Sequence, residues 1–161
     1  MDTKVAAQQL VAKAEMLIRR PVSEVFEAFV DPAMTSKFWF TGGSDKLAPG
    51  RRVRWDWKMY GFSVQADVKA FEENRRIVVD WSTGDEAPTT IEWRFTPRPD
   101  STTFVSITNG GFAGTTEEIA KQAINSAEGF AFVLAGAKAY LEHGISLDLV
   151  RDRHPDGLPG G

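Results

Sequence analysis

The sequence predicts an α+β domain in which an antiparallel sheet, preceded by a strand and two short helices, packs against one long C-terminal helix. Two patterns predict this class. Apolar and polar residues alternate along five successive segments between residues 53 and 109, as in β-strands. After Thr115 the apolar residues recur every three or four positions instead, as in a helix. The 161 residues suit one domain over 1–161, with a core at about 12–145 and a tail at about 146–161.

The opening segment predicts one strand and two short helices. Apolar residues occupy alternate positions within residues 12–20, which indicates a strand. Pro21 suits the first turn of a helix, where its missing N–H costs nothing. Asp31 ends that helix, because a residue that precedes a proline avoids the helical conformation. A second short helix is expected from about residue 32 to residue 38.

Five strands joined by short turns follow, and each has one apolar face. The turns are too short for the crossovers that parallel strands require, so the sheet is predicted to be an antiparallel meander. If this sheet curves around the long helix, its inner face is the surface that the helix covers. The residues expected on that inner face are Val53, Trp55, Trp57 and Met59; Val64, Ala66, Val68 and Ala70; Ile77, Val79 and Trp81; Ile91, Trp93 and Phe95; and Val105, Ile107 and Asn109.

The last regular element is predicted to be one helix from Thr115 to about Gly144. Thr115 and Glu118 form a capping box, and glycine is a typical residue at a helix C-terminus. Gly129 lies inside this helix and weakens it by about 1 kcal/mol relative to alanine, so the sequence allows a kink or a break near it. The segment from residue 153 onwards is rich in proline and glycine and is expected to fray.

A series of short motifs carries a family resemblance over residues 14–156. The motifs are Arg20–Pro32, Phe38–Thr41, Trp55–Trp57, Met59–Gly61, Gly111–Gly114, Gly129-Phe130, Leu134–Gly136, Leu141–Gly144 and Asp152–Pro155. In order and spacing, they resemble the START-like (SRPBCC) superfamily, in the bacterial AHSA-like, polyketide-cyclase-like branch related to the C-terminal domain of the heat-shock protein 90 ATPase activator. The resemblance implies a helix-grip fold, in which a curved antiparallel β-sheet wraps around the C-terminal α-helix and encloses a cavity. Chemistry does not follow from it, because the superfamily includes lipid carriers, hormone receptors and cyclases.

Aromatic residues are the strongest sign of a binding site. Five tryptophans are many for this length, and four of them fall on inferred inner faces of strands. Each either packs in a solid core or lines a cavity, and the mixture of large and small residues on the helix stripe fits both interpretations. Asn109 is either a polar anchor in the cavity or a turn residue before Gly110. The candidate cavity-lining residues are Trp39, Phe40, Trp55, Trp57, Val64, Ala66, Trp81, Trp93, Asn109, Phe130, Leu134 and Ala137.

No motif predicts a catalytic residue, a metal site or a cofactor. The chain has no cysteine, which excludes disulfides and thiolate ligands. No GxSxG, Walker, GxGxxG or HExxH motif is present. The two glycine-rich stretches, at 42–44 and 110–114, are interpreted as turns or a flexible lid. An enzyme would have to use residues such as Asp80, Glu92 or His143.

Charge and hydropathy restrict the classes of partner and the location that we expect for the protein. The net charge is −3 and the sequence has no block of basic residues, so nucleic acid is not expected as a partner. No apolar run reaches the ~20 residues that span a bilayer. Residues 1–11 lack the features of a secretory signal, so a cytoplasmic location is expected.

These observations lead to one function and two alternatives. The protein is expected to bind a small, mostly apolar ligand in a cavity between the sheet and the C-terminal helix. One alternative is a cyclase- or hydratase-type enzyme that uses the same cavity. The other is a chaperone-associated or self-associating module, and a homodimer stays open as an assembly.

Overall fold

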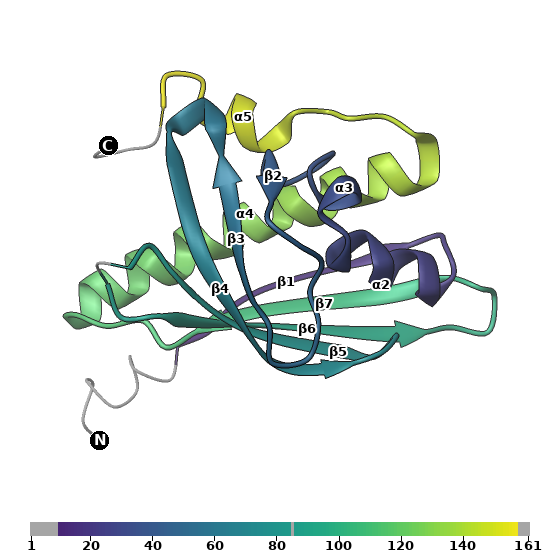
Figure 1. Ribbon diagram of the computed structural model, residues 1–161, viewed down its shortest axis with the longest axis horizontal. Helices are drawn as coiled ribbons and strands as arrows, with labels where there is room; N and C mark the ends of the chain where they lie inside the picture. The colour runs from purple at the N-terminus through teal and green to yellow at the C-terminus, as the bar shows by residue number, and fades with distance from the viewer. Residues whose placement is uncertain (1–9, 85, 158–161) are drawn as a thin grey trace.

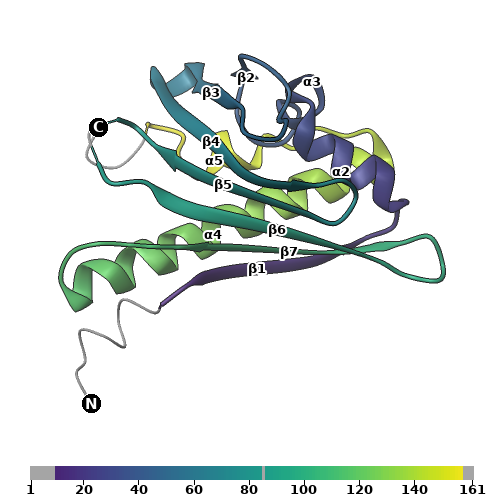
Figure 2. The ribbon, with the colours of Figure 1, turned by 60° about the horizontal axis from the view of Figure 1, so that its bottom comes forward.

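The computed structural model describes residues 10–84 and 86–157, which form one curved sheet with a long helix along its concave side (Figures 1 and 2). In this part of the chain seven strands lie in the order β1-β7-β6-β5-β4-β3-β2, and all neighbouring pairs are antiparallel. The predicted α+β class, the five-stranded meander and the helix-grip arrangement are therefore confirmed. In chain order the elements are β1 (Ala12–Ile18), α2 (Val22–Val30), α3 (Pro32–Thr35), β2 (Gly42–Gly43), β3 (Arg52–Trp57), the short 3-10 helix η1 (Lys58–Tyr60), β4 (Phe62–Glu72), β5 (Arg76–Ser82), β6 (Thr89–Pro97), β7 (Thr103–Gly110), α4 (Thr116–His143) and α5 (Leu149–Arg153).

The predicted alternation of the strands holds except at two positions. The pairing of β4 with β5 shifts between Val68 and Ala70, which is a β-bulge. After the bulge Phe71, not Ala70, lies opposite the buried Ile77, and its ring packs edge-on against Phe26. The expectation that Ala70 continues the inner face was therefore wrong.

The second exception is Met59, which the alternation assigns to the same strand face as Trp57. Strand β3 ends at Trp57, and Met59 lies in η1 instead. The 3-10 turn ends at Gly61, whose φ of 61° is a left-handed conformation that glycine adopts without strain. A tight turn therefore replaces the last two residues of the predicted strand.

The glycine pair at 42–43 is not only a turn. Gly42 and Gly43 form the edge strand β2 and pair with Asp56 and Trp55. A Cβ atom on Gly43 would lie 2.9 Å from the Cβ of Pro32, so a residue without a side chain lets β2 approach α3. The glycines thus permit close packing at this edge.

Helix α4 is one continuous helix with the predicted caps. The Thr115 hydroxyl accepts a hydrogen bond from the Glu118 amide at 3.2 Å, and Gly144 ends the helix with a φ of 68°. The helix continues without interruption through Gly129, so the break that the sequence allowed there does not occur. Packing against the sheet therefore outweighs the weak helix propensity of one glycine.

The C-terminal end of α4 is joined to the end of β1 through Glu142. One Glu142 oxygen accepts hydrogen bonds from the Arg19 amide at 2.8 Å and from Lys138 Nζ at 2.6 Å. Burial alone raises the pKa of Glu142, but these hydrogen bonds outweigh it and lower the pKa below its ordinary 4.5. The carboxylate is thus more stable in the folded protein than in the unfolded chain.

We expect the Glu142→Gln variant to be less sensitive to acid than the wild type. A lowered folded-state pKa stabilises the protein fully above the unfolded value of 4.5, and this contribution is lost as the pH falls through the folded-state pKa. Urea unfolding across a pH series should show a shallower loss of stability on acidification for the variant, and less stability than the wild type at neutral pH. Identical pH dependence of the two proteins would contradict this account.

Helix α5 was not predicted, and it lies almost entirely before the segment from residue 153 onwards that was expected to fray. Tyr60 Oη shares its one proton between the carbonyl oxygens of Val150 and His154, at 3.2 and 3.3 Å, and Arg153 pairs with Glu128 of α4. Burial raises the pKa of Tyr60 above its ordinary 10.0, so its hydroxyl remains a donor at neutral pH. Residues 1–9, 85 and 158–161 lie outside the described residues, including most of the segment in which no secretory signal is predicted and the end of the tail.

The close contact between α4 and the chain after α3 depends on Gly136. A Cβ atom added there would lie 3.0 Å from the Cβ of Phe38 and 3.3 Å from its carbonyl oxygen. These atoms belong to a buried segment of the core, so they have little room to move.

We expect Gly136→Ala to destabilise the protein by about 1–3 kcal/mol, because overpacking outweighs the gain in helix propensity. Gly129→Ala is the matched control. A Cβ atom at Gly129 meets no atom within 4 Å, so this change should stabilise the protein by up to about 1 kcal/mol. Thermal and urea denaturation measure both effects, and shifts of the same sign would show that the helix does not pack as described.

Candidate functional site

A cavity of about 440 Å³ lies between the N-terminal half of α4 and the inner face of the sheet. The curvature of the sheet makes this space, because strands β4 and β5 diverge from α4 while β1 stays in contact with it (Figure 2). Helix α5 contributes Val150 to its edge. The apolar side chains that line the cavity are Trp39, Trp57, Phe62, Val64, Ala87, Trp81, Phe112, Phe130, Val133 and Val150.

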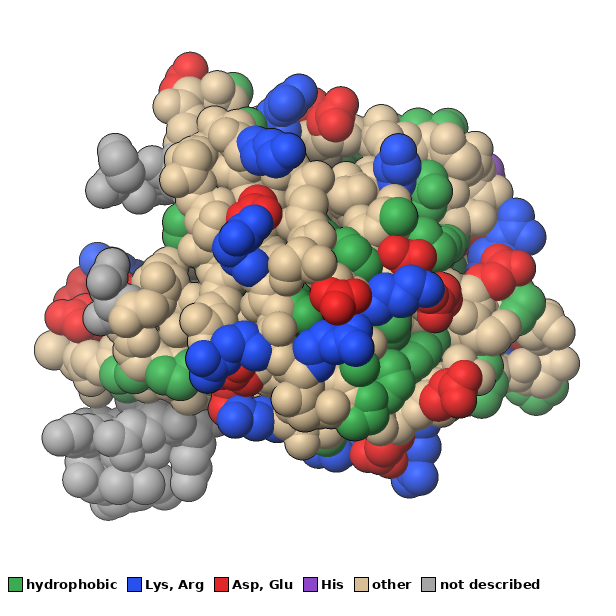
Figure 3. Space-filling model, in the orientation of Figure 1, with side chains coloured by type: hydrophobic (Ala, Val, Ile, Leu, Met, Phe, Trp, Pro, Cys, Tyr) green, Lys and Arg blue, Asp and Glu red, His purple; other side chains and the backbone are tan. Residues whose placement is uncertain are grey.

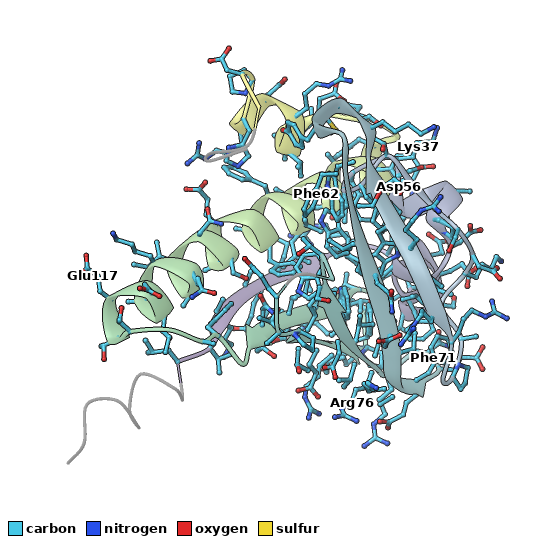
Figure 4. The ribbon with its side chains drawn as sticks, turned by 60° about the vertical axis from the view of Figure 1, so that its left-hand side comes forward. Lys37, Asp56, Phe62, Phe71, Arg76 and Glu117 are labelled. Atoms are coloured by element: carbon cyan, nitrogen blue, oxygen red, sulfur yellow. The ribbon has the colours of Figure 1, made fainter. Side chains whose placement is uncertain are left out.

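Four of the aromatic wall residues lie on regular elements. Trp57 ends β3, and Phe62 begins β4 after the tight turn through η1. Figure 4 labels Phe62 on the side of the sheet that faces α4. Trp81 lies on β5 and Phe130 on α4, with their ring centroids 6.0 Å apart. The cavity is therefore lined by rigid aromatic surfaces that come from both the sheet and the helix.

Trp39 lies at the boundary between the cavity and the packed core. It is 8% exposed, and it follows α3 in the sequence. Its ring centroid lies 5.7 Å from that of Phe130, which lines the cavity, and 5.0 Å from that of Trp55, which does not. Trp39 thus forms part of the wall between the cavity and the packed core around Trp55.

Besides Phe130 and Val133, helix α4 presents polar and small residues to the cavity. Residues Gln122, Asn125, Ser126 and Gly129 line the cavity from successive turns of α4. Because a Cβ atom at Gly129 meets nothing within 4 Å, the missing side chain leaves open space on this face.

The structure divides the predicted lining residues into two sets of equal size. Trp39, Trp57, Val64, Trp81, Asn109 and Phe130 lie at the cavity. The C-terminal half of α4 packs directly against the sheet and α2, so the small residues expected to leave space there are covered. Phe40, Trp55, Ala66, Trp93, Leu134 and Ala137 are buried in the packed core away from the cavity.

One buried donor stands out in that core. The indole N–H of Trp93 has no hydrogen-bond partner among the described residues, although the side chain is 1% exposed. A buried donor without a partner costs free energy. Trp93 faces aromatic rings such as Phe29 and Trp39 and not the cavity, so it does not serve as a polar contact for a ligand.

Asn109 and its neighbours form the polar end of the cavity. Asn109 is 3% exposed and lies on the inner face of β7, so it is not a turn residue. Its amide oxygen accepts from Ser126 Oγ at 2.8 Å. Its amide nitrogen donates to the Thr89 hydroxyl at 3.1 Å and to the Thr90 carbonyl at 3.0 Å. This network joins β6, β7 and α4 beside the apolar wall.

Several of these residues were missed in the sequence. Phe62 is two positions before Val64 and so lies on the same face of β4. The alternation would have predicted it if the strand had been extended back to the turn. Ser126 and Gly129 lie beside the apolar stripe of α4 and not on it. In this half of the helix the stripe itself packs through Ile119 against Ala12. Hydrophobic periodicity therefore identifies the packed face of the helix and, of the cavity face, Phe130, but it misses the polar and small lining residues.

Ionisable groups are scarce at the cavity. Among the described lining residues, Glu86 is the one charged side chain. Asp80 accepts a hydrogen bond from Thr90 Oγ1 at 2.6 Å, Glu92 pairs with Arg76, and the His143 side chain is 67% exposed at the end of α4. None of these three, considered above for acid–base chemistry, lines the cavity.

The outer surface of the sheet carries mixed charge. Arg54 pairs with Asp56 at 2.9 Å, and Arg52 pairs with Asp67 at 2.6 Å. The hydrogen bond from Ser63 lowers the pKa of Asp56, and Arg54 acts in the same direction. Figure 3 shows basic and acidic side chains beside one another across the face that carries β3 and β4.

Within the described part of the chain, no group of three or more His, Asp or Glu side chains is placed to hold a metal ion. No helix among residues 10–84 and 86–157 is both long enough and apolar enough to span a membrane.

A curved antiparallel sheet that grips a C-terminal helix, with a cavity between the two, defines a START-like helix-grip protein. The chain belongs to the family described as activator of Hsp90 ATPase homolog 1-like proteins, whose model matches residues 19–142. A search of curated proteins finds no match.

Solved structures share this fold. Protein SSP2350 from Staphylococcus saprophyticus is 27% identical, with a TM-score of 0.73 over 86% of this chain and 96% of that protein. The Aha1 dimer from Colwellia psychrerythraea is 18% identical, with a TM-score of 0.71 over 84% of this chain and 98% of that chain. DynU16, a protein of the dynemicin biosynthetic locus, is 21% identical, with a TM-score of 0.73 over 84% of this chain and 48% of that chain.

Proposed function

We propose that this protein binds a small, mostly apolar ligand in the cavity between the sheet and the N-terminal half of α4. The observation that carries the proposal is the cavity itself, whose volume of about 440 Å³ lies within the range of small-molecule sites. Its walls are rigid aromatic side chains, and its polar groups are gathered at one end around Asn109. Apolar surface that a ligand buries there contributes roughly 25 cal/mol per Å².

The alternatives differ in what they require. An enzyme in the same cavity needs an acid–base arrangement, and the described lining offers a single carboxylate, Glu86. A chaperone-associated module is supported by the description of the family alone. A homodimer is supported by the dimeric Aha1 structure of similar fold. A cytoplasmic location remains part of the proposal on the sequence grounds given above.

Titration with aminoanthracene, a neutral apolar fluorophore, tests the proposal. Trp39, Trp57 and Trp81 line the cavity, so a probe bound there accepts excitation energy from tryptophan. We expect saturable, one-site growth of tryptophan-sensitised probe emission and a matching rise in thermal stability, because a ligand that binds only the folded state stabilises it. Absence of a saturable signal up to the solubility limit of the probe would refute the proposal.

A further inference from the structure

The hydrogen bonds at the polar end of the cavity fix the orientation of the Asn109 amide. The Thr90 carbonyl oxygen, 3.0 Å from Asn109 Nδ2, can only accept a hydrogen bond, so the amide nitrogen must face it. The amide oxygen then faces Ser126 Oγ, and Ser126 must donate its hydroxyl proton to it at 2.8 Å. Both N–H groups of Asn109 are used within the protein, toward Thr89 and Thr90.

The same reasoning fixes the direction of the Thr89 hydroxyl. Its oxygen accepts from Asn109 Nδ2 at 3.1 Å and from the indole Nε1 of Trp81 at 2.9 Å. An indole N–H can only donate, so this second bond has no alternative direction. A threonine hydroxyl has two acceptor positions and one proton, and both acceptor positions are occupied here. Its proton must therefore point to a third partner.

No such partner is present among residues 10–84 and 86–157, where no hydrogen bond donated by the Thr89 hydroxyl is found. Thr89 lines the cavity, so its donor is available to a molecule inside it. Asn109 and Trp81 act as positioning residues, because their N–H groups hold the hydroxyl oxygen and leave only its proton free.

The charge of the lining restricts the ligand further. Glu86 is the one charged group among the described lining residues, and no lysine or arginine is found there. A carboxylate or phosphate on the ligand would lose its hydration without gaining a cation. A ligand group that accepts a hydrogen bond from the Thr89 hydroxyl is therefore expected to be neutral.

We propose that the Thr89 hydroxyl donates a hydrogen bond to a carbonyl oxygen of the ligand, so that the cavity selects neutral apolar molecules that carry a ketone, aldehyde or ester group. This inference rests on the proposed binding function. It differs from that function in naming the polar group that is recognised and the residue that recognises it.

Fluorenone and fluorene form a matched pair of probes, because both are planar and apolar and they differ by a carbonyl in place of a methylene. We expect the wild type to bind fluorenone about two- to tenfold more tightly than fluorene, measured by displacement of aminoanthracene, the range that one neutral hydrogen bond provides. Thr89→Val removes the hydroxyl but keeps the β-branch, and it should abolish this preference, so that fluorenone and fluorene bind the variant with equal affinity. Thr89→Ser keeps the hydroxyl and should retain the preference.

The outcomes separate this inference from the proposed function. If fluorene and aminoanthracene both fail to bind the wild type, the binding function itself is wrong. If they bind and Thr89→Val still prefers fluorenone, the function stands and the role of Thr89 is refuted. Infrared spectroscopy needs no variant: the carbonyl stretch of fluorenone bound to the wild type should fall below its frequency in an apolar solvent, and an unshifted band would also refute the role of Thr89.

Discussion

Replacing Trp55 by alanine is expected to lower the free energy of unfolding by about 3–5 kcal/mol, the usual cost of removing a buried tryptophan. Trp55 is 2% exposed. Its ring stacks on Phe40 with centroids 5.3 Å apart and lies 5.0 Å from Trp39. Because small domains have a total stability of about 5–15 kcal/mol, this change removes a large share of it. Urea unfolding followed by far-ultraviolet circular dichroism measures the loss without relying on tryptophan emission.

The neighbouring residue provides a matched control for that experiment. The Arg54 side chain is 65% exposed on the outer face of β3, where its ion pair with Asp56 is open to water. Surface pairs of this kind contribute little, so Arg54→Ala should change stability by less than about 0.5 kcal/mol. If Arg54→Ala proved the more damaging change, the register of β3 would be off by one residue.

The second large effect is expected on binding. Gly129→Phe places a ring in the open space of the cavity, where a Cβ atom meets nothing within 4 Å. The ring should compete with the probe and weaken aminoanthracene binding by about tenfold or more, equivalent to about 1.4 kcal/mol. Stability should hold, or rise by about 0.5 kcal/mol, because phenylalanine is a better helix former than glycine.

Two other phenylalanine substitutions on α4 test whether the effect depends on the position of the ring. Ala131 is exposed on α4, so Ala131→Phe should leave both probe affinity and stability nearly unchanged. Ala137 is 0% exposed and lies away from the cavity, so Ala137→Phe should overpack the core and cost about 1–3 kcal/mol. If Gly129→Phe bound the probe as tightly as Ala131→Phe, the probe would not occupy the described cavity.

The sequence predicted the fold well where local periodicity determines structure. The alternation of Val53, Trp55 and Trp57 placed a strand and its buried face correctly, and the capping box at Thr115 placed the start of α4. It failed where one local irregularity changes the periodicity. The bulge after Val68 leaves no pattern that distinguishes it from regular alternation, so Ala70 was assigned to the inner face in place of Phe71.

The candidate site was less predictable, because a cavity is defined by the places where two surfaces do not meet. Leu134 and Gly129 lie on the same helix, but the curvature of the sheet covers the first and leaves the second open. Sequence periodicity contains no information on that curvature. The role assigned to Thr89 depends on three hydrogen-bonding groups from different strands, which only the tertiary structure brings together.

The central claim is that the space beside α4 is a binding cavity for apolar molecules, and a crystal structure of the protein with aminoanthracene tests it most directly. The account predicts electron density for the ring system among Trp39, Trp81 and Phe130, with the open face of Gly129 beside it. Density for the probe on the outer surface alone, with the cavity closed by repacked side chains, would contradict it.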